Sequence, residues 1–190
     1  MIAFIDLEAS ALGRDGHPTE VGVALTDGRD LHEVRSWLIR PHPDWMFADG
    51  GEWDPVAAEM TGITPGLLRH HGLDARHVVG DLDALLTRVQ CVYSDAPEQD
   101  QSWLSTLYDA ADASHTVRLH DVMEIDRLQR KMNLSRARQL WDHTIQAVDA
   151  AHALPRHRAG PDATRLALAF LSLERASIAQ ETVRRMCQER

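Results

Sequence analysis

Phe4-Ile5-Asp6-Leu7-Glu8, near the start of the chain, has the pattern of a buried strand that ends in two carboxylates. We expect this strand to cover residues 1–7. Because side chains alternate between the two faces of a strand, Asp6 and Glu8 lie on the same face. Unpaired carboxylates on a buried strand are costly unless they bind a metal ion or accept hydrogen bonds. The pattern therefore predicts a functional site at this end of the strand.

The length and composition indicate one domain that spans residues 1–190. The chain is long enough to bury a substantial core and too short for two ordinary domains. Its apolar runs are short and broken by charges, which predicts no contact with a membrane. The two cysteines, Cys91 and Cys187, show neither metal-ligand nor redox spacing, and this is typical of the reducing cytoplasm.

The chain is acidic, with a formal net charge of -9. A protein that binds a long nucleic acid usually carries a basic surface, so this charge argues against a long binding groove. A small pocket for the end of a nucleic acid remains compatible with it, because bound metal cations would supply positive charge.

The pattern of apolar residues predicts strands first and then alternating strands and helices. Further strands are expected at residues 20–26, 33–40, 90–93 and 116–122. Helices are expected at residues 55–60, 74–89, 98–111 and 135–151, and from Pro161 onward, and residues 41–53 are expected to form a loop. A capping-box pattern at Ser177 and Gln180 predicts a separate short helix at the end. The order predicts an α/β fold, a mixed five-stranded sheet with helices packed on it.

A second motif lies late in the chain, where His157 is followed five positions later by Asp162. None of the other ten histidines has an aspartate at that offset. Gly160 and Pro161 allow the chain to turn into a helix here, which places Asp162 in the first turn, where the helix dipole favours a carboxylate. Together with Asp6 and Glu8, this motif indicates a site for hard cations such as Mg²⁺ or Mn²⁺.

These residues resemble the DEDDh family of 3'-to-5' exonucleases, which have an RNase H-like fold. Four segments carry the resemblance, namely residues 4–10, 18–22, 54–64 and 157–162. The third segment departs from the family at Thr61, where a histidine is usual. The resemblance covers nearly the whole chain.

The middle motif of the family departs further from the usual pattern, because Tyr93-Ser94-Asp95-Ala96-Pro97-Glu98-Gln99-Asp100 offers two candidate ligands. We favour Asp100, since Trp103 and Leu104 match the apolar pair that follows the family's ligand. This choice requires one extra residue in the loop. Asp95 remains the alternative ligand or a neighbour that supports it.

The resemblance implies a catalytic set of His157, Asp6, Glu8, Asp100 and Asp162. The four carboxylates would hold two divalent metal ions, and His157 would act as the general base. The products would be 5'-mononucleotides from the 3' ends of single-stranded RNA or DNA. By position, Ser10 would contact the terminal 3'-hydroxyl and Leu12 would wedge beside the terminal base. Further substrate contacts are assigned to Leu7, Ala9 and Arg158.

Two other functions stay open at this point. The irregular middle motif also suits a nucleic-acid-binding or protein-binding module with weak or absent turnover. An endonuclease of the broader RNase H-like class fits less well, because His157 and its spacing belong to the exonuclease pattern. The choice between RNA and DNA is also open, as is a homodimer, for which the last helices are apolar enough.

Overall fold

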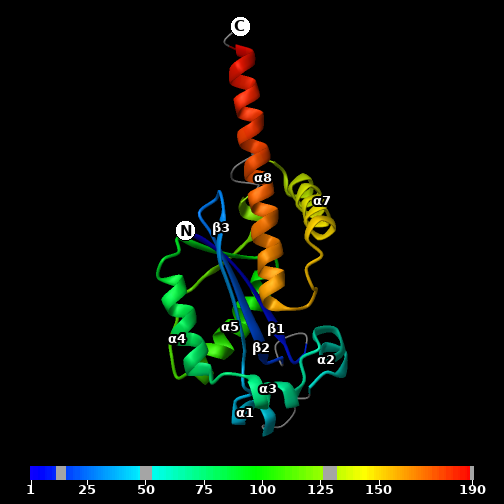
Figure 1. Cartoon of the computed structure of the whole chain (residues 1–190). Helices are drawn as coiled ribbons and strands as arrows, with labels where there is room; N and C mark the ends of the chain where they lie inside the picture. The colour runs from blue at the N-terminus through cyan, green and yellow to red at the C-terminus, as the bar shows by residue number, and fades with distance from the viewer. Residues whose placement is uncertain (12–15, 48–52, 126–131, 189–190) are drawn as a thin grey trace.

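A mixed five-stranded sheet forms the centre of the protein (Figure 1). The computed structural model describes residues 1–11, 16–47, 53–125 and 132–188. The strands are β1 (Ile2–Ala9), β2 (Pro18–Thr26), β3 (Leu31–Leu38), β4 (Cys91–Ser94) and β5 (Leu119–Asp121), in the order β3-β2-β1-β4-β5. The first three strands form an antiparallel meander, whereas β4 and β5 continue the sheet parallel to β1. The expected sheet is thus confirmed.

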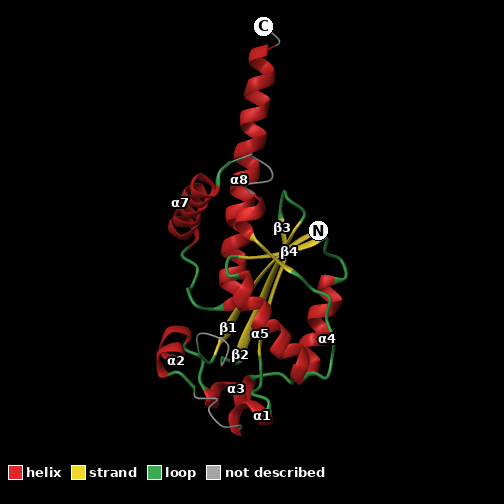
Figure 2. Ribbon diagram, turned by 180° about the vertical axis from the view of Figure 1, so that it is seen from behind, coloured by secondary structure: helices red, strands yellow, loops and turns green. Residues whose placement is uncertain are grey.

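Helices cover both faces of this sheet (Figures 1 and 2). Helices α7 (Leu134–His152) and α8 (Ala159–Gln188) lie on one face, and α4 (Ala75–Leu86) and α5 (Pro97–Ala110) on the other. The short helices α1 (Pro43–Phe47), α2 (Pro55–Thr61) and α3 (Pro65–His71) lie near the end of β1. The arrangement is a single domain whose β1 strand is enclosed on both faces.

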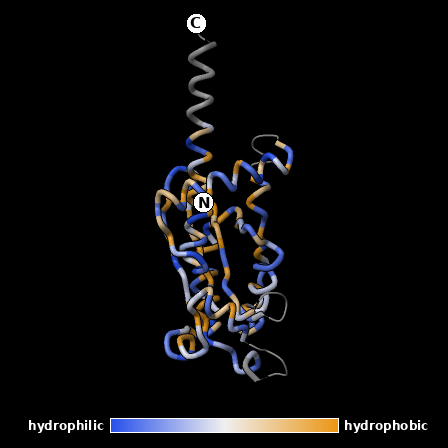
Figure 3. Tube along the Cα trace, turned by 90° about the vertical axis from the view of Figure 1, so that its right-hand side faces the viewer, coloured by the Kyte–Doolittle hydropathy of each residue, from blue (hydrophilic) through white to orange (hydrophobic). Residues whose placement is uncertain are grey.

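Alternate residues of β1 divide between the two layers of the core. Ile5 and Leu7 pack with α4 and α5, whereas Phe4 packs with α8, its ring centroid 5.5 Å from that of Phe170. Figure 3 shows hydrophobic residues concentrated along the central strands. By the same alternation, Asp6 and Glu8 lie on the face that α8 covers.

Three secondary-structure predictions are wrong in detail. Helix α8 runs without a break through Ser177, so the separate final helix does not form. The chain has neither glycine nor proline after Pro161 to end that helix. Helix α8 also begins at Ala159, two residues before the predicted start. Within the expected loop of residues 41–53, residues 43–47 form α1.

Helix α3 was not predicted, although its N-terminal signal is present in the sequence. Thr64 caps the helix by accepting a hydrogen bond from the Leu67 N–H, and Pro65 occupies the first turn. Helix α7 begins at Leu134, one residue before the predicted start, and Asn133 caps it by accepting a hydrogen bond from the Arg136 N–H. None of the described helices is both long and apolar enough to cross a lipid bilayer.

Candidate active site

Two groups of three carboxylates share Asp6 and form an acidic cluster at the end of β1. One group consists of Asp6, Glu8 and Asp162, and the other of Asp6, Asp95 and Asp100. Within each group, one ligand oxygen from every residue lies within 4.8 Å of the others. The structure therefore brings together all four predicted carboxylates and the alternative, Asp95.

The sheet topology explains how the middle motif reaches Asp6. Strand β4 pairs with β1 only from Ile2 to Phe4. After Ser94 the chain leaves the sheet beside the unpaired edge of β1 and enters α5 at Pro97. Asp95 and Asp100 thereby come close to Asp6, which is two residues beyond the last paired position.

Asp95 and Asp100 occupy different environments. Asp100 is 2% exposed, and its carboxylate accepts hydrogen bonds from the Ser94 hydroxyl and the Leu7 backbone N–H. Asp95 is exposed and lines the large cavity over the cluster. Both have an oxygen within reach of a cation beside Asp6, so the choice between them stays a prediction.

The first turn of α8 places Asp162. Its Oδ2 accepts a hydrogen bond from the Arg158 backbone N–H at 3.1 Å, and its own N–H donates to the Arg158 carbonyl at 2.9 Å. This reciprocal pair caps the helix. Asp162 is in the predicted first turn.

Close packing of α8 on the sheet depends on Gly22, which pairs with Asp6 across β1 and β2. A Cβ added at Gly22 would lie 2.1 Å from the Ala159 carbonyl carbon and 2.3 Å from the Gly160 nitrogen. Only glycine therefore lets the start of α8 rest directly on the strand beside Asp6.

An ion pair between a buried carboxylate and a half-exposed arginine fastens the same helix start to β2. Glu20 is 1% exposed and accepts hydrogen bonds from Arg158 Nε and Nη2, both at 2.9 Å, and from the Ala159 N–H at 3.0 Å. Such a bidentate, charge-assisted contact is among the stronger hydrogen-bonding arrangements in proteins. The Arg158 guanidinium thus faces Glu20 in this structure, and its predicted contact with substrate stays untested.

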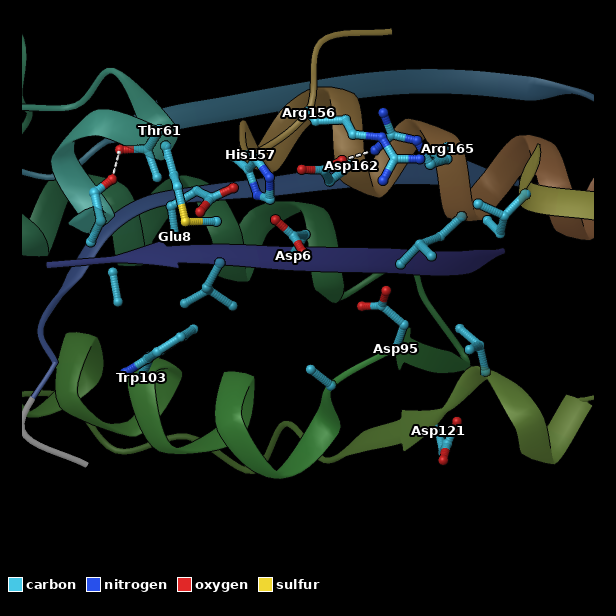
Figure 4. Close-up of a pocket in the computed structure, with 18 of the residues that line it drawn as sticks. Asp6, Glu8, Thr61, Asp95, Trp103, Asp121, Arg156, His157, Asp162 and Arg165 are labelled. Atoms are coloured by element: carbon cyan, nitrogen blue, oxygen red, sulfur yellow. Dashed lines mark hydrogen bonds and ion pairs between the residues drawn. The ribbon is translucent and has the colours of Figure 1, made fainter. Parts of the chain in front are cut away.

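His157 lies on the segment between α7 and α8 and lines the cavity together with Asp6 and Glu8 (Figure 4). The residue is exposed and has a left-handed backbone with φ 58°. Its ring makes no hydrogen bond to any described residue. The backbone on either side therefore determines where the imidazole points.

The cavity above the cluster has a volume of about 550 Å³. Val56 and Met60 of α2, both exposed, contribute one apolar wall, and the more buried Trp141 and Ile145 of α7 contribute a second. Arg138, also on α7, lines the cavity and forms no ion pair with a described residue. The space thus combines acidic, apolar and cationic surfaces.

The predicted substrate contacts do not all face this cavity. Leu7 and Ala9 contribute to its lining. Ser10 is 3% exposed, lines a separate cavity of about 60 Å³, and accepts a hydrogen bond from the His17 N–H at 3.0 Å. Leu12 lies outside the described residues. These roles remain predictions.

Burial and mutual repulsion make the cluster hard to ionise without a cation. Burial raises the pKa of Asp6 well above its ordinary value, and the nearby Asp100 and Glu8 raise it further. Burial and the neighbouring Glu20 raise the pKa of Glu8 from 4.5 to about 7. Burial likewise raises the pKa of Asp100 from 3.8 to about 7. A bound cation would relieve this repulsion.

The donor set fits hard divalent cations. All the candidate ligand atoms are carboxylate oxygens, which Mg²⁺ and Mn²⁺ prefer. The buried carboxylates also supply the charge that a cation would neutralise. Asp6, Glu8 and Asp162 could hold one ion, and Asp6 with Asp95 and Asp100 could hold another.

We expect the metal-free protein to lose stability as the pH rises from about 4.5 to about 7. Folded Glu8 and Asp100 keep their protons up to a pKa of about 7, whereas the unfolded chain releases them at lower pH. The unfolded state therefore binds fewer protons across this window, and the free energy of unfolding falls as pH rises. Thermal melting in a chelator should give a lower Tm at about pH 7.5 than at about pH 5.

Divalent cations should reverse this loss, since they bind the folded, ionised cluster. Mg²⁺ or Mn²⁺ should raise Tm more at the higher pH, whereas Na⁺ at matched ionic strength should not. Asp149 does not contribute to the change of stability with pH in this window. Contacts with arginines lower its pKa, so it is ionised in both the folded and the unfolded state. A Tm that is independent of both pH and divalent cations would contradict this account of the cluster.

Solved structures of exonuclease I resemble this chain. E. coli exonuclease I in a zinc-bound complex with single-stranded DNA has a TM-score of 0.64 and 16% identity, and the match covers 92% of this chain and 40% of that one. The E. coli enzyme with a dA16 oligonucleotide also has a TM-score of 0.64 and 16% identity, and the match covers 90% of this chain and 40% of that one. Exonuclease I from Methylocaldum szegediense has a TM-score of 0.60 and 18% identity, and the match covers 92% of this chain and 40% of that one.

The protein has the RNase H-like exonuclease fold. This fold confirms the predicted fold class. The chain spans about two fifths of the length of these exonucleases. No protein-family model and no curated protein matches the sequence. At this level of identity the likeness establishes the fold alone.

Sequence reasoning missed several residues that build the site. The roles of Glu20 and Gly22 as anchors for α8 were not predicted, although both lie in a segment that resembles the family. Arg165 of α8 was also missed, and it bonds to Asp149, Asp162 and the segment before His157. An arginine three residues after Asp162, on the same side of a helix, was the available signal.

Proposed function

We propose that this protein is a metal-dependent 3'-to-5' exonuclease that removes 5'-mononucleotides from single-stranded nucleic acid. The observation that carries the proposal is the convergence of two carboxylate groups on Asp6, with His157 lining the same cavity. This arrangement joins candidate ligands for hard cations to an imidazole, the side chain that most often serves as a general base.

Each group in the cavity has a role in this reaction. The carboxylates hold the divalent cations, which when bound would lower the pKa of a water molecule and stabilise the leaving oxygen. The imidazole of His157 accepts the proton of the attacking water. The apolar walls of Val56, Met60 and Trp141 hold the terminal nucleotide and exclude bulk water.

The cavity and the charge support a short single-stranded end as the substrate. A volume of about 550 Å³ is within the range of small-ligand pockets, roughly 300–1,000 Å³, and suits a nucleotide rather than a long duplex. The net charge of -9 also argues against an extended phosphate track. The likeness to exonuclease I, solved with single-stranded DNA, supports the same class of substrate.

The proposal is tested with single-stranded DNA and RNA oligonucleotides that carry a 5' label, in Mg²⁺ or Mn²⁺. We expect a ladder of products shortened from the 3' end, no cleavage of a circular strand, and no activity in a chelator. His157→Ala should lower kcat by about 10²–10⁴-fold, because it removes the general base.

His152→Ala is a matched control, since this exposed histidine ends α7 and does not line the cavity. Its activity should equal that of the wild type. Cleavage of the circular strand would indicate an endonuclease instead. If metal binds but no oligonucleotide is cut, the protein is a binding module and the exonuclease proposal fails.

A further inference from the structure

We propose that Arg165 is a positioning residue, one that holds both Asp162 and the connecting segment, residues 153–158, which carries His157. For its effect on catalysis this inference rests on the proposed function. The effect of Arg165 on the geometry of the candidate metal ligands does not rest on the proposed function, because metal binding can be measured without any substrate.

A single buried guanidinium joins three parts of the chain. Arg165 is 6% exposed and projects from α8 into the wall of the cavity (Figure 4). Its Nε donates to Asp149 Oδ1 at 2.5 Å, near the end of α7. Its Nη2 donates to the carbonyl oxygens of Leu154 and Pro155 at 3.2 and 3.3 Å, and its Nη1 forms an ion pair with Asp162.

These bonds make Arg165 one of the anchors of the connecting segment, which Arg156 also ties to Asp149. Arg165 holds the segment before His157, and Glu20 holds it afterwards through Arg158 and Ala159. His157 lies between the anchors with a left-handed backbone and no hydrogen bond from its ring to a described residue. Loss of the first anchor would free the backbone that aims the imidazole.

The same arginine orients a candidate metal ligand. One oxygen of Asp162 contacts Arg165, and the other accepts the Arg158 N–H. A carboxylate has about four lone-pair positions, so both bonds leave room for a cation. Hydrogen bonds of this kind around metal ligands set their orientation, and their removal typically weakens metal binding by about 10–100-fold.

Charge and positioning predict opposite effects, and this makes the inference testable. A positive charge beside a cation site opposes metal binding, so removal of Arg165 would tighten binding if charge alone mattered. Asp149 pairs with Arg165 and also with Arg156, so it offsets part of the charge of Arg165. We therefore expect the loss of positioning to dominate.

The experiment compares Arg165→Met, Arg165→Lys and Asp149→Ala with the wild-type protein. Lysine keeps the charge, but a single ammonium group cannot reach all four acceptors. Isothermal titration measures the Mn²⁺ Kd without nucleic acid, and hydrogen exchange reports on the amides of the connecting segment. Oligonucleotide assays at saturating Mn²⁺ then give kcat and KM separately.

Both arginine variants should raise the Mn²⁺ Kd by about 10-fold or more. They should also speed amide exchange in the connecting segment and lower kcat, with KM for the oligonucleotide nearly unchanged. Asp149 also bonds to Arg156, so Asp149→Ala is compared with Arg156→Met, which removes that contact alone. Asp149→Ala should speed the same exchange further than Arg156→Met while leaving Asp162 paired, and it keeps the test open if the Arg165 variants do not fold. Arg175→Met is the matched control, because Arg175 is an exposed arginine on the same helix that bonds to the Arg29 carbonyl.

Tighter Mn²⁺ binding in Arg165→Met together with wild-type behaviour in Arg165→Lys would show that only charge matters and would overturn the inference. Unchanged Mn²⁺ affinity and exchange in Arg165→Met, Arg165→Lys and Asp149→Ala would overturn it as well. A wild-type protein without nuclease activity would contradict the proposed function alone, since the Mn²⁺ and exchange measurements would still decide the role of Arg165.

Discussion

Asp6→Asn is expected to abolish tight divalent-metal binding and to lower nuclease activity by on the order of 10³-fold or more. Asp6 is the one carboxylate that belongs to both candidate groups, so its loss removes a ligand from each at once. Calorimetry with Mn²⁺ and single-turnover cleavage of a labelled oligonucleotide measure the two effects.

The metal-free Asp6→Asn protein should be more stable than the metal-free wild type at neutral pH. Burial and the neighbouring carboxylates disfavour ionised Asp6 in the folded state, as its raised pKa indicates, and asparagine carries no charge. The variant therefore separates a failure to bind metal from a failure to fold. Cation affinity and activity equal to the wild type would refute the assignment of this cluster.

Under the same conditions, the variants Asp95→Asn and Asp100→Asn show which of the two residues is the metal ligand of the middle motif. If Asp100 is the ligand, its variant should match Asp6→Asn in activity, whereas Asp95→Asn should retain more. The reverse order would assign the role to Asp95.

Gly22→Ala is expected to disrupt the site from a position with no chemical group of its own. The added methyl would lie 2.1 Å from the Ala159 carbonyl carbon, and this backbone cannot move without lifting the start of α8. Overpacking of this kind costs about 1–3 kcal/mol, or roughly 2–12 °C in Tm for a domain of this size. Because Asp162 and His157 move with the helix start, the Mn²⁺ Kd should rise and kcat should fall as well.

Gly80→Ala provides the control for Gly22→Ala. Gly80 lies in α4 with no atom within 4 Å of an added Cβ. Alanine there should stabilise the protein by about 0.5–1 kcal/mol, because it lowers the entropy lost on helix formation. A Gly22→Ala protein with unchanged Tm and metal affinity would show that the contact between β2 and α8 does not determine the site.

The parts of the fold that depend on local pattern were predictable. The alternation in β1 correctly placed Asp6 and Glu8 on one face, and the position of Asp162 in a helical first turn followed from Gly160 and Pro161. Helix ends were harder to predict. Ser177 has the pattern of an N-terminal cap, but α8 continues through it.

Contacts between distant segments were not predictable in the same way. Glu20 and Arg158 are 138 residues apart in sequence, and nothing local to either residue indicates the partner. Asp95 and Asp100 could not be separated either, because both follow β4 closely and both reach Asp6.

The sequence by itself indicated the chemical type of the candidate site: a pair of carboxylates at the end of a strand, and a further carboxylate at a helix start with a histidine five residues before it. Periodicity and spacing carry that information, because they follow from backbone geometry. Only the tertiary structure decided how the site is held, through Gly22 under the start of α8, Glu20 on one side of His157 and Arg165 on the other. These contacts depend on how the helices pack on the sheet, and packing brings together residues that have no relation along the chain.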